Sequence, residues 1–123
     1  EKVRQRWAKL GKPTTIRAVL EAEIATGIHQ PGKAGLTLRD ASVAVAIVWL
    51  RRSLAFRTSL LEGFGKNRTA ALSVIATDAY KKELEKHHNW MLKSTFKLAF
   101  NAAPSRSEVL HRLGVGLDLD EEF

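Results

Sequence analysis

The chain has 123 residues, of which 45% are hydrophobic, and its formal net charge is +7. This length fits one domain with a core of its own, and the hydrophobic share excludes a disordered polyelectrolyte. The chain has no cysteine, which excludes disulfides and thiolate chemistry. No apolar run reaches the ~20 residues of a membrane-spanning helix, and no signal peptide is visible. These features favour a soluble cytoplasmic protein.

The positive charge favours nucleic acid or an anionic membrane surface as a partner. The basic residues are spread over several segments, and the acidic ones gather at the C-terminus in Asp118, Asp120, Glu121 and Glu122. A nucleic-acid-binding domain more often has one dense basic stripe or a known motif. Neither is found, so a basic helical nucleic-acid-binding module is kept only as an alternative.

The N-terminal third of the chain predicts two helices and a loop. Apolar residues at helical spacing predict a helix over residues 1–10, followed by a Gly-Lys-Pro break. Thr14 or Thr15 is the predicted N-cap of a second helix, which runs to about Ala25. Residues 26–36 contain several glycines and a proline, so they are predicted to form a surface loop.

A long central helix is predicted next. Thr37 is its expected N-cap, and Asp40 lies favourably near its positive end. Residues 41–52 are apolar on nearly all sides, so this part of the helix belongs inside the protein. The helix is expected to end at Gly63, and residues 63–67 are predicted to form a second loop.

The C-terminal half continues the helical pattern. Residues 69–103 predict one long helix or two helices in line, stopped by a proline. Ser105 and Glu108 form a capping box that opens a short helix, and Gly114 closes it. The acidic tail, residues 115–123, has no predicted structure. No strand pattern or internal repeat is found, so the predicted fold class is all-α.

Helical spacing places Val45, Trp49 and Phe56 on one face of the central helix, with Arg52 about 60° from Trp49. An indole beside polar groups can stack on the apolar C–H face of a sugar ring. Trp49 can equally be a core residue, with Arg52 extending to solvent. The spacing is compatible with both interpretations.

The His88-Asn-Trp90 segment holds the second candidate. If this segment is helical, Leu84, His88 and Phe96 fall near one face, so the imidazole would lie among apolar residues and could hydrogen-bond a ligand amide. A core histidine satisfied by backbone or water is the alternative. Trp90 would then point outward, which is typical of a membrane interface, or it would contact another helix.

Metal binding and catalysis have little support. Glu83 and His87 are four residues apart, but no third ligand and no HExxH motif accompanies them. No phosphate-binding glycine loop, nucleophile elbow or carboxylate pair is found. The sequence therefore predicts a protein that is not an enzyme and has neither a metal nor a cofactor.

Four motifs in order resemble the glycolipid transfer protein family: Val48–Phe56, Asp78–Tyr80, His88–Trp90 and Ala102–Arg106. The resemblance implies a two-layer helical sandwich that encloses the chains of a sphingolipid. Residues 1–114 would form the central part of such a domain, which is then incomplete, and residues 115–123 a tail or a linker to a further helix. The implied role is non-enzymatic transfer or sensing of glycosphingolipids, with transient binding to membrane surfaces.

The resemblance also implies site residues. The family's headgroup centre contains an Asp-x-x-x-Asn-x-x-Lys motif, a Trp and a His. Lys2, Trp49 and His88 match its lysine, its sugar-stacking tryptophan and its amide-binding histidine. Trp90 matches the tryptophan at the membrane contact. The hydrocarbon pocket would be lined by Val45, Phe56, Leu84, Phe96 and Phe100.

Val45 and Trp49 indicate the type of headgroup. Family members that carry ceramide-1-phosphate have arginines at these two positions, and a phosphate needs such cationic donors. A valine and an indole offer none, so the sequence favours a sugar headgroup. A carrier or sensor of ceramide-1-phosphate remains the alternative within the family.

Overall fold

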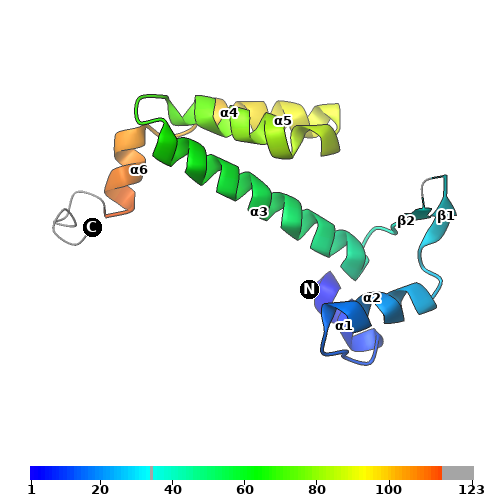
Figure 1. The fold of residues 1–123 in the computed structure, drawn as a ribbon. Helices are drawn as coiled ribbons and strands as arrows, with labels where there is room; N and C mark the ends of the chain where they lie inside the picture. The colour runs from blue at the N-terminus through cyan, green and yellow to red at the C-terminus, as the bar shows by residue number, and fades with distance from the viewer. Residues whose placement is uncertain (34, 115–123) are drawn as a thin grey trace. The chain divides into compact units, whose positions relative to one another are not determined.

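The computed structural model describes residues 1–33 and 35–114, except for the side chain of Lys2. The chain divides into two compact units, residues 1–51 and residues 52–123, each considered by itself. Figure 1 shows the order of the elements. The helices are α1 (Lys2–Lys9), α2 (Ile16–Ala25), α3 (Val43–Lys66), α4 (Leu72–Glu83), α5 (Trp90–Asn101) and α6 (Arg106–Arg112), and the strands are β1 (Gln30–Gly32) and β2 (Gly35–Thr37).

The first two helices form where the sequence predicts them. The side chain of Thr15 caps α2 by accepting a hydrogen bond from the backbone N–H of Ala18 at 3.1 Å. The turn between α1 and α2 is tied to α1 because the Trp7 indole donates to the carbonyl of Pro13 at 2.8 Å. Trp7 thus has a structural partner at the break that follows its helix.

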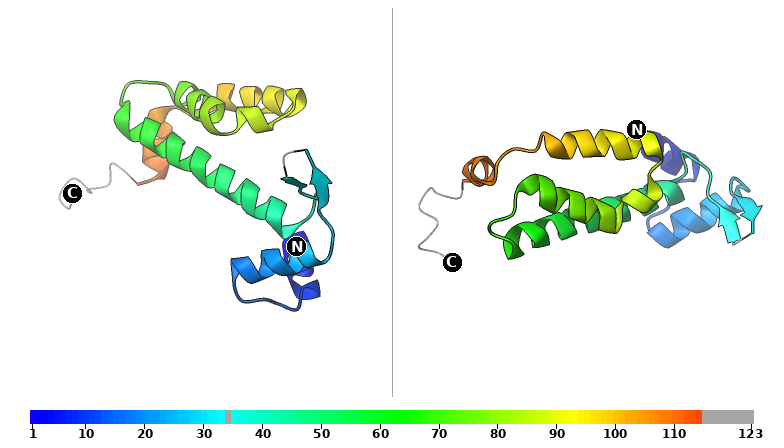
Figure 2. Two further views of the ribbon diagram at one scale, coloured as in Figure 1. Left: turned by 45° about the vertical axis from the view of Figure 1, so that its right-hand side comes forward. Right: turned by 90° about the horizontal axis from the view of Figure 1, so that it is seen from above.

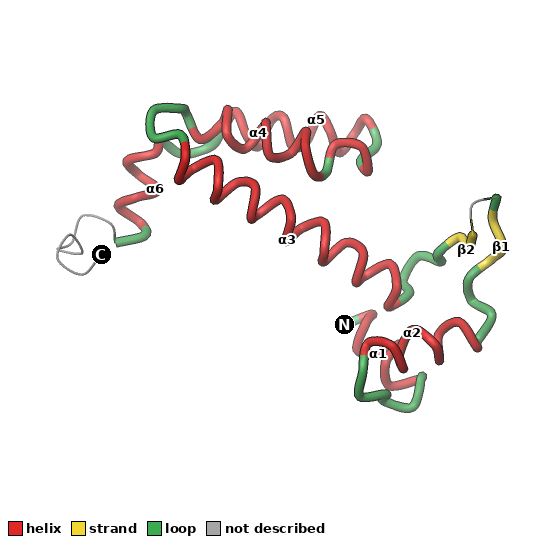
Figure 3. Tube along the Cα trace, viewed as in Figure 1, coloured by secondary structure: helices red, strands yellow, loops and turns green. Residues whose placement is uncertain are grey.

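The predicted loop over residues 26–36 is wrong in part, because it contains a small antiparallel sheet (yellow in Figure 3). Gln30 pairs with Thr37 and Gly32 pairs with Gly35. Gly35 has a φ of +116°, which only glycine adopts readily. Strands of three residues are too short to show the alternation that identifies a strand in a sequence.

The N-terminus of α3 differs from the prediction. Thr37 belongs to β2 and does not cap the helix, and Asp40 lies before the helix begins. The cap is Ser42, whose hydroxyl accepts the N–H of Val45 at 3.1 Å. The carboxylate of Glu23, on α2, accepts the N–H groups of Val43 and Ala44, each at 2.9 Å.

The C-terminus of α3 also differs. The helix passes through Gly63 and ends at Lys66, so the predicted loop over residues 63–67 is wrong. A Cβ atom at Gly63 would lie 2.7 Å from Cγ2 of the buried Ile75, on α4. Glycine is required here because α3 and α4 approach closely, and it does not mark a helix end. The guanidinium of Arg106 donates to the carbonyls of Phe64 and Asn67, at 2.6 and 2.9 Å, and lies 3.9 Å from the centre of the Phe64 ring.

The single helix or pair of helices in line predicted over residues 69–103 is a helical hairpin. A 3₁₀ turn, η1 (Glu85–His87), follows α4, and α5 then returns beside it (Figure 2). Asn89 caps α5 by accepting the N–H of Leu92 at 3.0 Å. The core of this unit lies largely on α4 and consists of Ile75, Ala76, Ala79, Tyr80 and Leu84.

The last helix confirms the predicted cap. The hydroxyl of Ser105 accepts the N–H of Glu108 at 3.2 Å, while the Glu108 carboxylate pairs with Arg112. Gly114 follows the helix with a φ of +75°, as a glycine at a helix end commonly does. The acidic tail, residues 115–123, lies outside the described residues. The all-α class is therefore confirmed, with the small sheet as an addition.

Candidate functional site

His88 lies at the junction between η1 and α5. Its backbone is extended (φ −105°, ψ 142°), because the chain turns here before Asn89 opens α5. The helical geometry assumed for this segment is therefore wrong. The side chain nevertheless lies among rings, with centroid distances of 5.0 Å to Phe96 and 5.5 Å to Tyr80. The imidazole thus brings a polar group to an apolar surface.

The rings around His88 form one aromatic cluster, which we define as Phe56, Tyr80, His88, Phe96 and Phe100. Tyr80 stacks on Phe96 at 4.9 Å and meets Phe100 edge to face at 5.5 Å. Phe100 lies 5.7 Å from Phe96 and 6.2 Å from Phe56. Three helices, α3, α4 and α5, therefore contribute rings to one partly buried cluster with an imidazole at its end.

Tyr80 is the functional candidate that the sequence did not assign. Its hydroxyl and Nδ1 of His88 form a hydrogen bond of 3.0 Å. Burial, and then the charge of Glu85, raise the pKa of Tyr80, so the phenol stays protonated at neutral pH. Burial, followed by Arg52 and Lys93, lowers the pKa of His88, so the imidazole stays neutral. The Asp-Ala-Tyr motif was a signal for Tyr80, but only the folded hairpin places it against His88.

The other predicted residues of this unit lie in different settings. Leu84 is buried at the end of α4. Trp90 is the first residue of α5, and 76% of its surface is exposed. The structure therefore joins Phe56, Phe96 and Phe100 to His88 in one cluster, buries Leu84 and leaves Trp90 on the surface.

Lys2, Val45 and Trp49 belong to the N-terminal unit. Val45 and Trp49 are half-buried on the first two turns of α3. Lys2 begins α1, and its side chain lies outside the described part of the chain. The roles of these residues in binding a headgroup stay predictions.

The N-terminal unit also contains a polar centre that the sequence did not indicate. Glu23 is fully buried, and its carboxylate lies 3.4 Å from Nε of Arg6 and 3.4 Å from Nε2 of His29. Burial alone would raise the pKa of Glu23. Four groups lower this pKa, and their sum outweighs burial: the N–H groups of Ala44 and Val43, and the side chains of Arg6 and His29. The pKa of Glu23 therefore lies below its ordinary value. A buried anion at the positive end of a helix is electrostatically favourable.

This centre fixes the turn of α3 that leads to Val45 and Trp49. The imidazole of His29 is itself oriented, because its Nδ1 accepts the backbone N–H of Arg39 at 3.1 Å. The ring proton of the neutral form must then lie on Nε2, the atom that faces Glu23. No sequence spacing predicts such a contact, because Glu23 and Val43 are 20 residues apart.

Two absences apply to residues 1–33 and 35–114. This part of the chain contains no group of three or more histidine, cysteine or acidic residues that could hold a metal ion. It also contains no helix with the length and hydropathy that crossing a bilayer requires.

The fold and the cluster define a class: an all-α protein with a partly buried aromatic cluster that includes a neutral imidazole. A family model described as glycolipid transfer protein (GLTP) matches residues 1–115. The chain belongs to the glycolipid transfer protein family.

Individual relatives agree with this assignment. The chain is 33% identical to the glycolipid transfer protein of Danio rerio over 113 residues, which cover 88% of this chain and 51% of that protein. It is 35% identical to human pleckstrin homology domain-containing family A member 8 over 102 residues, which cover 83% of this chain and 18% of that protein. The chain thus spans about half the length of the Danio rerio relative.

A solved structure shows the same fold. The apo form of mouse ceramide-1-phosphate transfer protein matches with a TM-score of 0.63 and 22% identity, over 87% of this chain and 53% of that one. The likeness confirms the expected fold type.

Proposed function

We propose that this protein is a non-enzymatic carrier that moves a glycosphingolipid between membranes. The observation that carries the proposal is the aromatic cluster with His88 at its end. A ceramide has an amide next to two hydrocarbon chains, so it needs one polar partner beside a large apolar surface. Family membership, and the name of the Danio rerio relative, support the same ligand class.

His88 would bind the amide through Nε2. When Tyr80 donates its hydroxyl proton to Nδ1, the neutral imidazole carries its own proton on Nε2. That nitrogen then donates to the amide oxygen of the lipid. Tyr80 acts in this scheme as a positioning residue, because it sets the tautomer without contacting the lipid amide.

The sugar would be bound by Trp49 and Lys2. The half-buried indole of Trp49 offers a flat face for the C–H side of the ring. Lys2 would donate to the sugar hydroxyls. Val45, one helical turn before Trp49, adds no cation that would favour a phosphate. A preference for ceramide-1-phosphate is the alternative that a transfer assay would reveal.

The chains of the lipid would lie against Val45, Phe56, Leu84, Phe96 and Phe100. Each CH₂ group removed from water contributes about 0.8 kcal/mol, so the chains supply most of the affinity. The headgroup contacts then add orientation and selectivity. Residues 1–114 would form the central part of the lipid-binding domain, with residues 115–123 as its tail or a linker.

The carrier would work from the cytoplasm and bind membranes only transiently. The exposed Trp90 is the proposed contact with the bilayer, because an indole prefers the boundary between water and lipid. Basic side chains would assist on anionic surfaces.

Transfer of labelled glucosylceramide between vesicles tests the proposal. We expect the full chain to accelerate transfer, and Trp49→Ala to reduce it while Trp49→Phe retains part of it. Unimpaired transfer by Trp49→Ala would refute the stacking role, and no transfer by the wild type would refute the carrier role. Faster transfer of ceramide-1-phosphate would establish the phosphosphingolipid alternative. Salt-sensitive DNA binding without lipid extraction would support the nucleic-acid-binding module instead.

A further inference from the structure

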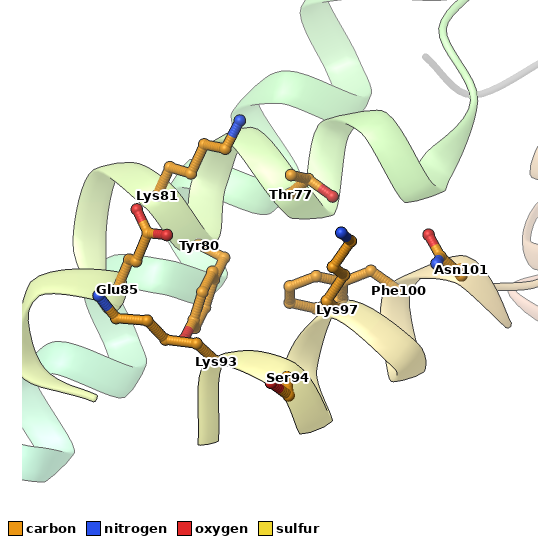
Figure 4. A pocket seen from close by; sticks show the side chains of 9 residues that line it. All are labelled: Thr77, Tyr80, Lys81, Glu85, Lys93, Ser94, Lys97, Phe100 and Asn101. Atoms are coloured by element: carbon orange, nitrogen blue, oxygen red, sulfur yellow. The ribbon is translucent and has the colours of Figure 1, made fainter. Parts of the chain in front are cut away.

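A groove lies between α4 and α5, with a volume of about 470 Å³. Figure 4 shows the rings of Tyr80 and Phe100 between the two helices, with lysine side chains around them. The aromatic rings form the wall that the groove shares with the aromatic cluster. The groove is lined by Thr77, Tyr80, Lys81, Glu85, Lys93, Ser94, Lys97, Phe100 and Asn101.

The charge of this groove is positive. Lys81, Lys93 and Lys97 line it, against the single carboxylate of Glu85. Among the residues that the structure describes, none of these three lysines forms an ion pair. Lys82, by contrast, faces away from the groove lining and pairs with Glu83 at 3.4 Å. The groove therefore keeps cationic donors that its own neighbours do not neutralise.

An exposed aromatic residue lies on the same helix as two of the groove lysines. Trp90, Lys93 and Lys97 follow one another on α5 at positions i, i+3 and i+7, so they share one face of the helix. Trp90 is 76% exposed, and the adjacent Met91 is 60% exposed. A helix with an exposed tryptophan and a row of lysines is typical of elements that lie on an anionic membrane surface.

We propose that this groove binds the phosphate of an anionic phospholipid that remains in the bilayer while Trp90 enters the interface. The ammonium groups of Lys81, Lys93 and Lys97 match a phosphate in charge, and the side-chain amide of Asn101 adds a neutral donor. The bound phospholipid is not the cargo. It would select the membrane at which the carrier exchanges its glycolipid.

Binding to vesicles without any glycolipid tests this inference. The full chain is sedimented with vesicles of phosphatidylcholine alone, and with vesicles that also contain phosphatidylserine. A lysine near an anionic surface contributes about fivefold in affinity, so Lys93→Gln combined with Lys97→Gln should weaken binding to the phosphatidylserine vesicles by about twenty-five-fold. Binding to phosphatidylcholine alone should not change.

A matched variant separates a site from general attraction. Lys9→Gln combined with Lys33→Gln removes the same charge from exposed positions of the N-terminal unit. We expect the logarithm of the affinity for phosphatidylserine vesicles to fall in this control by less than a quarter of its fall in the groove variant. Equal losses for the two variants, or no loss for the groove variant, would overturn the proposal. All four lysines are exposed, so circular dichroism should show unchanged helicity.

The cargo site and the groove can fail separately. If the groove variant binds phosphatidylserine vesicles like the wild type but glucosylceramide transfer proceeds, the groove proposal is wrong and the carrier stands. If the wild type transfers no glucosylceramide, but the groove variant loses binding to phosphatidylserine vesicles and the control variant does not, the groove proposal stands and the carrier proposal is wrong.

Discussion

Replacing Glu23 by glutamine should destabilise the N-terminal unit strongly. The carboxylate is fully buried and accepts the N–H groups of Val43 and Ala44, each at 2.9 Å. The glutamine amide has only one oxygen, so it can accept only one of these two N–H groups. Its NH₂ group would face the other N–H, which then has a donor opposite it and loses its acceptor. A hydrogen bond to a charged group contributes about 1.5–3 kcal/mol, and a buried N–H without a partner costs a similar amount. We therefore expect Glu23→Gln to lower the free energy of unfolding by about 2–4 kcal/mol.

The same substitution should change how stability depends on pH. Because the pKa of Glu23 is held below its ordinary value of 4.5, the unfolded chain binds a proton at this site before the folded one does. The resulting stability is fully present above pH 4.5 and is lost as the pH falls through the folded pKa. Glu23→Gln lacks this titrating group, so its stability should fall less on acidification than that of the wild type.

Urea unfolding followed by circular dichroism, at neutral and acidic pH, measures both effects. Glu21→Gln is the matched control, because Glu21 lies on the same helix, is exposed, and forms a long ion pair with the exposed Arg17 at 4.0 Å. The control should change the free energy of unfolding by less than about 0.5 kcal/mol. Equal stability of Glu23→Gln and Glu21→Gln, or identical acid profiles of Glu23→Gln and the wild type, would refute the reasoning.

Three further outcomes are expected. Gly63→Ala should lower the free energy of unfolding by about 1–3 kcal/mol in urea titrations, because its Cβ would clash with the buried Ile75; unchanged stability would contradict the close approach. Arg106→Ala should lower the melting temperature more than Arg112→Ala, since Arg106 donates to two backbone carbonyls and Arg112 forms an exposed ion pair with Glu108. NMR titration should give His88 a pKa below 6.5, so glycolipid transfer should decline on acidification with a midpoint below that value, because the gained proton prevents Nδ1 from accepting; a midpoint at the ordinary value would contradict it.

Local signals in the sequence predicted several helix ends correctly. Thr15 and Ser105 cap α2 and α6, because a hydroxyl needs only a backbone N–H three residues later. Glycine in the left-handed region closes α6 at Gly114 for an equally local reason. Features of this kind depend on a few neighbouring residues, so their pattern is visible without the fold.

The misplaced helix ends depend on contacts between distant segments. The start of α3 is fixed by Glu23 on another helix, so Thr37 was the wrong cap although its spacing to Asp40 was favourable. The predicted helix end at Gly63 was wrong, because this glycine allows α4 to approach α3 closely. The cap at Asn89 differs from these two positions, because it depends only on the N–H of Leu92, three residues later. The prediction for residues 69–103 did not include this cap.

The candidate site was partly accessible from the motifs. The resemblance pointed to His88, Phe56, Phe96 and Phe100. In the structure Tyr80 contacts three of these rings, and Phe56 joins the cluster through Phe100. The role of Tyr80 depends on the hairpin between α4 and α5, which brings two residues eight positions apart into a hydrogen bond. Periodicity along one helix could not show this pairing, because the two residues are not on one helix.

The two ends of α3 have a consequence for hydrogen exchange. Amides in the first turn of a helix usually exchange quickly, because they have no partner within the helix. In α3 the amides of residues 43–45 have side-chain acceptors, Glu23 and Ser42, and Arg106 covers carbonyls at the other end. The protection of backbone amides against hydrogen exchange should therefore be similar along α3, without the usual decrease toward the helix ends. Trp49 thus lies on a helix whose first turn is as firmly held as its middle, so its backbone keeps one position within the N-terminal unit.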